Sequence, residues 1–566
     1  MRDLVIDFNY PEGARWPPAD ERIRLDDLPP TGGFGLFRAV RAAARYPHYR
    51  RVYLACKDQR HVKTWLLLAA LSLAEEVWYV MLFTPVQRIT KGGLLWTLPF
   101  FRKIPSRVAA REFTRRLRAT VPRGAPLKTG GVLLLAHSYP PSAGGIQTSM
   151  VHAAEGFTER GLPVRVLDCY RTGWRSYDAD SPVPIRRVYT GRRFRLGECR
   201  RLARRAAEAA RPLPGRPPSR EVVGTIGKFL TACPAWKAAE FLGNFEAACR
   251  LISEGSPDTI HVGYCHPDSL AAMLLAAIGG WPYLIYAHGT ETLRFSKDKR
   301  LAPFFAKGFR AAAAVLANAH YCAEIVERGH GVPPDRIEII HPGVDFGHFD
   351  APPPEVLLDE LRRRHDISPV NRVLFIVGRV IPLKGFDTVL RALPRVLEEF
   401  PETVLLLGGD GFYLPRIRGM VGELGLTDAV RLLGRIPDDE LAACYHLADL
   451  YVMPSRDDPP GSFEGFGIVF MEAGAAGTPQ IGGRSGGIPD AVRDGETGLL
   501  CDPWDPDDLA EKILRLWRDP DLLKKLGEGA RRWAAEQDWE LVIGRKMALD
   551  ERMRKSAATG EWTPPG

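Results

Sequence analysis

The chain has 566 residues, enough for three or four domains of ordinary size. A hydrophobic fraction of 45% and a charged fraction of 26% are those of globular proteins, which excludes a fibrous chain or one disordered throughout. The formal net charge is +9, and this excess comes from two segments rather than from the whole chain.

The cysteines and the N-terminus indicate the compartment. The nine cysteines are scattered and never spaced C-x-x-C, which argues against a disulfide framework or a structural zinc site. The first residues lack the apolar core of a signal peptide. We therefore expect a cytoplasmic protein with reduced thiols.

The two basic segments are residues 84–123, with ten Lys and Arg against one acidic residue, and 186–220, with twelve against two. Such patches meet nucleic acid, acidic polysaccharide or an anionic membrane. No nucleic-acid-binding motif accompanies them, so the sequence favours the membrane surface and no nucleic acid. The alternative for 186–220 is a solvated helix and loop.

Residues 1–125 predict a small α/β extension. Strands are expected at 51–55 and 77–83, with an apolar helix at 62–74 between them. The following stretch, 91–103, is too short to span a bilayer. It places Trp96, Phe100 and Phe101 among cations, as in-plane membrane anchors do, although packing on the next domain explains it equally well.

From residue 131, strands alternate with helices as in a doubly wound sheet. The first expected strand, 132–136, leads to Gly144-Gly145 and a helix at 148–160, so backbone amides there can reach a phosphate or a sugar. A later strand, 284–287, ends at His288, where ligands of parallel sheets bind. A single histidine there is more often structural.

The second half repeats the pattern. Strands are expected at 373–377, 404–407, 430–433 and 450–453, and amphipathic helices at 355–364, 507–518, 521–526 and 530–535. Arg379 and Lys384 lie on the loop after its first strand, where an anionic ligand binds in such sheets.

Glu464 and Glu472 are eight residues apart, the first in a Gly-rich bend and the second in the apolar run after it. Eight residues is just over two helical turns, so both carboxylates can face one ligand. Carboxylates accept paired hydroxyls, which suits a sugar or a ribose. The alternative is one capping and one solvated glutamate on an ordinary helix.

The ordered set G-R-x4-K-G, G-G-D-G, L-G-R-I, P-S, E-G-F-G-x4-E and G-G-x-x-G-G-I-P resembles the large family 4 of retaining glycosyltransferases, which includes bacterial mannosyl- and glucosyltransferases. The resemblance covers residues 130 to 550. It implies an α/β protein of the GT-B fold, with two facing Rossmann-like domains and a cleft between them. The small α/β extension precedes these domains.

The resemblance also implies the role of each residue. Arg379 and Lys384 would hold the donor diphosphate, Glu464 the sugar hydroxyls and Glu472 the nucleotide ribose. The remaining members of the implied donor site are His288 at the sugar, the glycine loop Gly144 and Gly145, Arg435 and Ile436 near the base, and the run Gly465, Phe466, Gly467 and Ile468.

The expected domains are 1–125, then 126–345 with 535–555 on the acceptor side, then 346–534 for the nucleotide sugar, then a disordered tail, 556–566. The expected reaction is retaining transfer of a hexose from a GDP- or UDP-linked donor to a lipid-linked or cell-surface glycan, without a cofactor. Since no D-x-D motif occupies the expected place, we predict no metal requirement. Alternatives are an epimerase or soluble disaccharide-forming enzyme on the same fold, and a non-catalytic scaffold of glycan assembly. We expect a cytoplasmic protein, peripheral at the inner face of the cell membrane.

Overall fold

The computed structural model describes residues 99–119, 130–142, 144–170, 173–188, 196–457 and 461–565, and five strands among the first 98 residues. Its described side chains begin at Ser106. The chain divides into two compact units: residues 1–111 with 193–201 and 230–238, and residues 112–192 with 202–229 and 239–566.

The first unit contains a five-stranded sheet in the order β2-β1-β3-β4-β5. Its pairs are parallel except the antiparallel pair β4–β5. The strands are β1 (Asp3–Phe8), β2 (Glu21–Arg24), β3 (Arg51–Cys56), β4 (Glu76–Met81) and β5 (Thr84–Ile89). The strands predicted at 51–55 and 77–83 are confirmed as β3 and β4, and the sequence analysis missed the other three. The helix predicted at 62–74 lies outside the described residues.

The first sheet of the second unit has seven parallel strands in the order β12-β11-β10-β9-β6-β7-β8. Chain order therefore reverses between β6 and β9, and the carboxyl ends of strands at such a switch point form the ligand edge of an α/β sheet. The strands are β6 (Val132–Leu135), β7 (Val164–Cys169), β8 (Ile185–Val188), β9 (Thr259–Val262), β10 (Tyr283–Ala287), β11 (Ala314–Ala317) and β12 (Ile337–Ile339).

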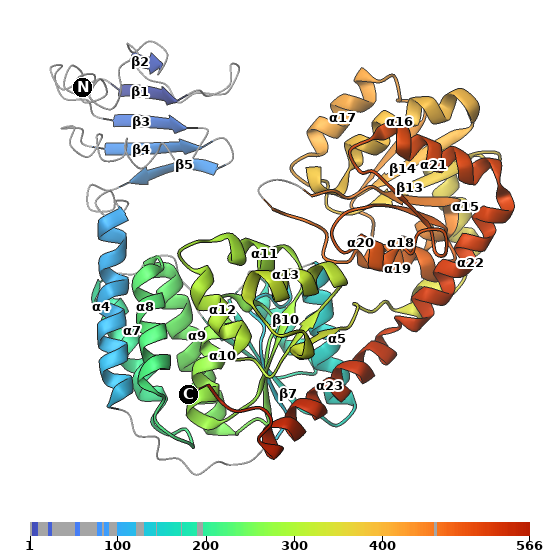
Figure 1. Cartoon of the computed structure of the whole chain (residues 1–566). Helices are drawn as coiled ribbons and strands as arrows, with labels where there is room; N and C mark the ends of the chain where they lie inside the picture. The colour runs from blue at the N-terminus through green and yellow to red at the C-terminus, as the bar shows by residue number, and fades with distance from the viewer. Residues whose placement is uncertain are drawn as a thin grey trace. The chain divides into compact units, whose positions relative to one another are not determined.

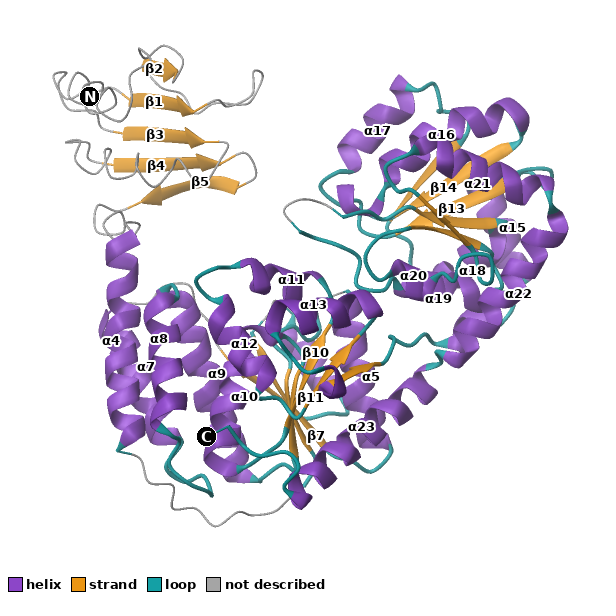
Figure 2. Ribbon diagram, in the orientation of Figure 1, coloured by secondary structure: helices purple, strands orange, loops and turns teal. Residues whose placement is uncertain are grey.

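The other sheet of this unit has six parallel strands in the order β15-β14-β13-β16-β17-β18. This is the Rossmann order, with its switch point between β13 and β16. The strands are β13 (Arg372–Val377), β14 (Thr403–Gly408), β15 (Val430–Gly434), β16 (Leu450–Met453), β17 (Gln480–Gly483) and β18 (Leu499–Cys501). Helices cover both faces of the sheet (Figure 2), so its central strands are buried runs without alternation.

Helices connect these strands in the order shown in Figure 1. In the first half they are α4 (Pro99–Arg118), α5 (Gly145–Glu159), α6 (Trp174–Asp180), α7 (Leu196–Ala209), α8 (Arg220–Ala232), α9 (Ala235–Glu254), α10 (Cys265–Gly279), α11 (Thr290–Lys297), α12 (Ala302–Arg310), α13 (His320–His330) and the 3₁₀ turn η2 (Pro334–Arg336). In the second half they are α14 (Phe346–Asp350), α15 (Glu355–Arg364), the 3₁₀ turn η3 (Pro382–Lys384), α16 (Phe386–Glu399), α17 (Leu414–Glu423), α18 (Asp438–Leu447), α19 (Ile468–Ala475), α20 (Ile488–Ala491), α21 (Pro506–Arg518), α22 (Pro520–Glu536) and α23 (Trp539–Thr559).

Capping aspartates set the boundaries of the last three helices. Asp505, Asp519 and Asp538 each accept a backbone N–H of the helix that follows, and proline opens α21 and α22. The prediction of separate helices at 521–526 and 530–535 is wrong, because α22 runs unbroken between them. Gly527 and Gly529 separate the two predicted pieces, but they stay helical, and a Cβ at either would lie 2.5 or 2.0 Å from a backbone carbonyl oxygen packed against the helix.

Helix α23 packs on the seven-stranded sheet, where Trp539, Ile543 and Leu549 join the core formed by β6 and α5. Asp550 accepts hydrogen bonds from Thr259 (2.6 Å) and contacts His261 (3.1 Å), both on β9. The prediction of a disordered tail at 556–566 is wrong for most of that segment. The helix continues to Thr559, and the indole of Trp562 is buried and donates to the Ala311 carbonyl (3.2 Å).

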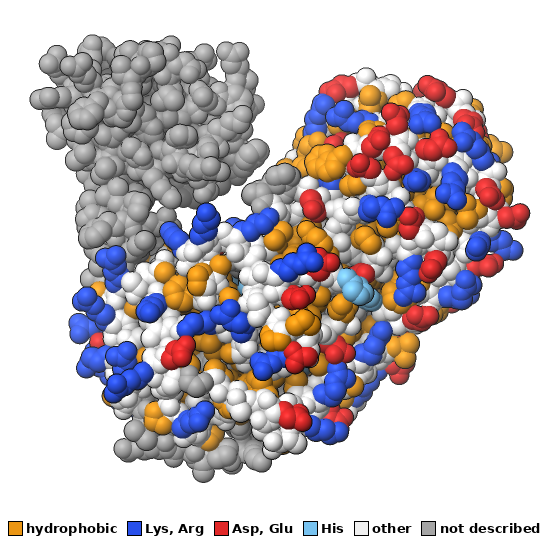
Figure 3. All heavy atoms as spheres, in the orientation of Figure 1, with side chains coloured by type: hydrophobic (Ala, Val, Ile, Leu, Met, Phe, Trp, Pro, Cys, Tyr) orange, Lys and Arg blue, Asp and Glu red, His pale blue; other side chains and the backbone are white. Residues whose placement is uncertain are grey.

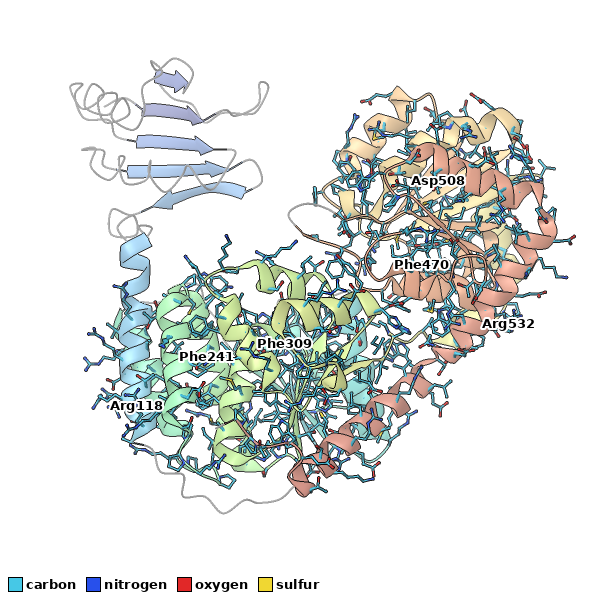
Figure 4. All side chains as sticks on the ribbon, in the orientation of Figure 1. Arg118, Phe241, Phe309, Phe470, Asp508 and Arg532 are labelled. Atoms are coloured by element: carbon cyan, nitrogen blue, oxygen red, sulfur yellow. The ribbon has the colours of Figure 1, made fainter. Side chains whose placement is uncertain are left out.

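Three helices, α4, α8 and α9, share an aromatic core. Phe241 of α9, labelled in Figure 4, packs edge-on to Phe113 of α4 and to Phe229 of α8. Lys and Arg gather on the outside of α4 (Figure 3), where the exposed residues are Arg107, Arg111, Arg115 and Arg118. Among the described residues, no helix is both long and apolar enough to cross a membrane.

The basic segment 186–220 is not one solvated patch. Arg187 lies on β8 and is buried, where it pairs with Asp168 and with both carboxylate oxygens of Asp178 (3.0 and 3.1 Å). Arg187 therefore pairs with carboxylates inside the protein and does not contribute to a basic surface. The exposed arginines of α7 are Arg200, Arg201, Arg204 and Arg205. Sequence counts of charge could not distinguish these two settings.

Candidate active site

The connections that follow β13 and β16 lie against each other at the switch point of the six-stranded sheet. The first runs from Gly378 through η3 to Gly385, and the second leaves β16 at Pro454. A Cβ at Gly385 would lie 2.2 Å from the Pro454 carbonyl oxygen, and its φ is +73°. Only glycine permits both this backbone conformation and this approach.

Arg456 fixes the start of the second connection. Its guanidinium is buried and donates to both carboxylate oxygens of Asp387 (2.9 and 3.0 Å) and to Thr388 (3.1 Å), both in the first turn of α16. One guanidinium nitrogen contacts both oxygens of Asp387 and another donates to Thr388, so the side chain is held at two points of α16. The chain that leads to Glu464 therefore begins from a fixed point.

Lys384 and Glu464 are brought together here. The ammonium donates to Glu464 Oε2 at 2.7 Å, and the two side chains are 11% and 20% exposed. They come from different connections, 80 residues apart in the chain. The pair places one cation and one carboxylate at the same point of the ligand edge, where each retains enough exposure to contact a ligand.

Glu472 lies in the second turn of α19, as the spacing predicted. Gly467, with φ +95°, precedes the helix, and Tyr445 of α18 donates its hydroxyl to Glu472 Oε2 at 2.7 Å. Burial raises the pKa of Glu472, while the Tyr445 hydrogen bond and the charge of Lys384 lower it. Lys384 therefore hydrogen-bonds Glu464, and its positive charge also acts on Glu472.

Three other predicted residues surround this edge. Arg379, directly after Gly378, and Arg435, directly after β15, are exposed. Ile436 is partly buried, and its Cδ1 lies 2.5 Å from the position of a Cβ at Gly408. Glycine at the end of β14 therefore leaves room for Ile436.

In the seven-stranded half, His288 follows β10 and is 4% exposed. Asn318 donates its amide to the His288 carbonyl (3.2 Å) and contacts Nδ1 (3.3 Å). Burial, and then the positive charge of Lys546, lower the pKa of His288 to about 3, against a hydrogen bond to the Gly263 backbone that raises it. The imidazole is therefore neutral at physiological pH.

Glu291 shapes the turn at His288. Its Oε1 accepts the backbone N–H groups of His288 (2.8 Å) and Gly289 (3.1 Å). The next residue, Thr290, exchanges two hydrogen bonds with the Phe463 backbone (2.9 and 3.0 Å). The loop that carries His288 is thereby tied to the loop that carries Glu464.

Glycines allow the two loops to touch. A Cβ at Gly465 would lie 2.0 Å from the His288 carbonyl oxygen, which is a backbone clash. A Cβ at Gly145, in the first turn of α5, would lie 3.5 Å from Ile468 Cδ1. Phe466 is buried with its ring stacked on His341 at 5.0 Å. Gly144, with φ +147°, precedes α5.

The structure therefore brings Gly145, His288, Glu464, Lys384 and the run 465–468 into one region. The sequence analysis did not identify Tyr445, Asn318, Thr290 or Arg456. Tyr445 lies in the second half of α18 and belongs to no motif, so no local signal marks it. Thr290 could have been noticed, because it lies two residues after His288 at a strand end.

Two family models match the chain. One, described as "Glycosyl transferases group 1", matches residues 359–533, and the other, "Glycosyltransferase Family 4", matches residues 209–348. The GDP-mannose-dependent alpha-(1-6)-phosphatidylinositol monomannoside mannosyltransferase of Mycolicibacterium smegmatis is 32% identical over 313 residues, which are 53% of this chain and 80% of the relative. The D-inositol 3-phosphate glycosyltransferase of Thermobispora bispora is 38% identical over 39% of this chain and 51% of its own length.

Solved structures show the same architecture. Anabaena Alr3699/HepE in complex with UDP and glucose aligns with a TM-score of 0.55 and 17% identity over 75% of this chain and 99% of its own. Sucrose-phosphate synthase from Thermosynechococcus elongatus aligns with a TM-score of 0.57 and 22% identity, over 76% and 100%. At 17% and 22% identity, the similarity shows that the fold is shared.

Proposed function

This chain belongs to glycosyltransferase family 4 and has the GT-B fold, and from that premise we propose that it moves a hexose with retention of configuration. It is a glycosyltransferase that uses a nucleotide-sugar donor. The proposed acceptor is a lipid-linked or cell-surface glycan, and transfer needs no metal.

The observation that carries the proposal is the Lys384–Glu464 pair at the switch point, with Glu472 in the next helix. Lys384 and Arg379 neutralise the leaving diphosphate, and their interaction strengthens as the glycosidic bond to phosphate breaks. Glu464 holds sugar hydroxyls. Glu472 holds the ribose, and its Tyr445 partner favours the ionised form that accepts two hydroxyl hydrogens.

His288 completes the sugar site from the other half. Its neutral ring is assigned to the donor sugar, and the Thr290–Phe463 contacts keep the His288 loop beside Gly465. Gly144 and Gly145 leave backbone N–H groups open at the start of α5, next to Ile468. We assign no protein nucleophile. The leaving phosphate assists attack on the same face of the sugar.

Two further elements of the proposal concern organisation. The acceptor-side domain comprises 126–345 with 535–555, which the core shared by β6, α5 and α23 supports, and the donor domain comprises 346–534.

The exposed arginines of α4 support peripheral binding to an anionic membrane. The aromatic residues predicted to insert, Trp96, Phe100 and Phe101, lie outside the described side chains.

The test is a panel of GDP- and UDP-linked sugars, scored by release of the nucleoside diphosphate without acceptor. GDP-mannose is tested first because the M. smegmatis relative is described as GDP-mannose-dependent. Lys384→Met should reduce release by about 100-fold or more, since it removes one charge-assisted bond to the leaving group. Wild-type release from this variant would exclude the proposed diphosphate role.

Retention and metal independence have separate readouts. Proton NMR of the product should show the anomeric configuration of the donor, and inversion would contradict the proposal. Turnover should be the same with and without added Mg²⁺ or Mn²⁺. A requirement for either ion would mean that a metal assists departure of the diphosphate.

A further inference from the structure

Three side chains that can ligate a metal converge at the carboxyl edge of the seven-stranded sheet. His137 follows β6, Cys169 ends β7, and Glu240 lies on α9. Strands β6 and β7 pair in parallel, so the residues that follow them share one edge. An imidazole nitrogen, the thiol sulfur and a carboxylate oxygen all lie within 4.8 Å of one another.

Two of the three groups are buried, and His137 is half-buried. Cys169 is 3% exposed and Glu240 is 7% exposed, and His137 Nε2 lies 3.5 Å from Glu240 Oε1. Backbone φ at His137 is +57°, the left-handed region that non-glycine residues rarely occupy, and its ring stacks on Tyr264 at 4.9 Å. The imidazole is thus held in place, as a binding site requires.

We propose that His137, Cys169 and Glu240 bind one divalent transition-metal ion, and that the ion is zinc. Nitrogen, sulfur and oxygen ligands together suit Zn²⁺, whereas Mg²⁺ and Ca²⁺ take oxygen ligands. Three protein ligands leave a fourth position for water. The ligands are distant in sequence, which is why the cysteine spacing gave no sign of a zinc site.

The site would fix the connection from β6 to α5, because His137 begins the segment that ends at Gly144 and Gly145. It belongs to the half that carries His288, and its ligands are not among the residues proposed to hold the donor. Binding requires the Cys169 thiolate, so it releases a proton and tightens as pH rises. The inference is independent of the donor assignment.

The test is a Co²⁺ titration of the full-length protein after removal of metal by a chelator. Thiolate ligation to Co²⁺ gives a charge-transfer absorption in the near ultraviolet, which should saturate at one ion per chain. Cys169→Ser should abolish this band. The matched control is Cys249→Ser, which removes another buried thiol, on the helix that carries Glu240, and should keep the band.

Glu240→Gln keeps the side-chain shape and removes a ligand charge, so the Co²⁺ affinity should fall by at least about 10-fold. Circular dichroism establishes that each variant is folded. The proposal is overturned if folded wild-type protein gives no charge-transfer band, or if Cys169→Ser retains it. Nucleoside diphosphate binding is measured on the same samples, so a failure of this site is distinguishable from a failure of the donor site.

Discussion

Tyr445→Phe removes one oxygen from the donor half and changes little else. The Tyr445 ring is buried between Phe349 and Phe375, with ring centroids at 5.8 and 5.2 Å, and phenylalanine keeps these contacts. The hydroxyl donates to Glu472 Oε2 at 2.7 Å. A hydrogen bond to a charged group contributes about 1.5–3 kcal/mol.

Part of that energy should appear in nucleotide binding. If the ionised Glu472 grips the ribose, losing its partner loosens the carboxylate and disfavours its ionised form. With 1.4 kcal/mol per factor of ten, the affinity for the free nucleoside diphosphate should fall by about 10-fold in Tyr445→Phe. The free protein should also lose stability, by up to about 1.5–3 kcal/mol, because the buried Glu472 carboxylate loses a hydrogen bond while all ring contacts remain.

The pH dependence gives a second readout with a definite sign. Burial raises the pKa of Glu472, and Tyr445 lowers it. The contribution of the ionised carboxylate is present above that pKa and is lost as pH falls through it. Without Tyr445 the pKa rises further, so the variant should lose affinity at a higher pH than wild type.

Calorimetric titration with the diphosphate, from about pH 8 to about pH 5, measures both effects. Comparing the two proteins at each pH cancels the ionisation of the nucleotide itself. Equal affinities with identical pH profiles would refute the assignment of Glu472 to the nucleotide.

Three more predictions concern other parts of the chain. Gly465→Ala places a Cβ 2.0 Å from the His288 carbonyl oxygen, so Glu464 should shift and kcat fall by about 10–100-fold; unchanged kcat would contradict the contact. Arg187→Met leaves two carboxylates without their cation and should cost about 3–5 kcal/mol in urea unfolding, whereas a loss below about 1 kcal/mol would mean that the pair is not buried. Serine substitutions at four exposed arginines of α4 should weaken binding to anionic vesicles by up to about 1 kcal/mol per residue, measured by co-sedimentation. Unchanged co-sedimentation would exclude this surface as a membrane contact. The four residues are Arg107, Arg111, Arg115 and Arg118.

Much of the six-stranded sheet could be predicted from the sequence, because its apolar runs and its glycine positions both indicate the same strands and turns. The runs at 404–407 and 450–453 are uninterrupted apolar segments of β-branched and aliphatic residues, and the structure has β14 and β16 there. The eight-residue spacing from Glu464 placed Glu472 in the second turn of a helix, which α19 confirms. Helix periodicity and glycine positions are local properties of the chain.

The parts that were missed depend on distant contacts. Arg187 is one of many arginines by composition, and only the position of Asp168 on the neighbouring strand makes it internal. The partner of Glu472, Tyr445, comes from another helix, 27 residues away. Trp562 lies in a stretch rich in proline and glycine, yet its indole finds the Ala311 carbonyl. Tertiary packing, rather than local preference, decides each of these.

The central claim is that the two glutamates divide the donor between them, and calorimetry of the two charge-removing variants tests it most directly. Free nucleoside diphosphate carries the ribose but no sugar. Glu472→Gln should therefore weaken its binding, while Glu464→Gln should bind it as wild type does and fail in transfer. Equal losses of diphosphate affinity in both variants would contradict the account.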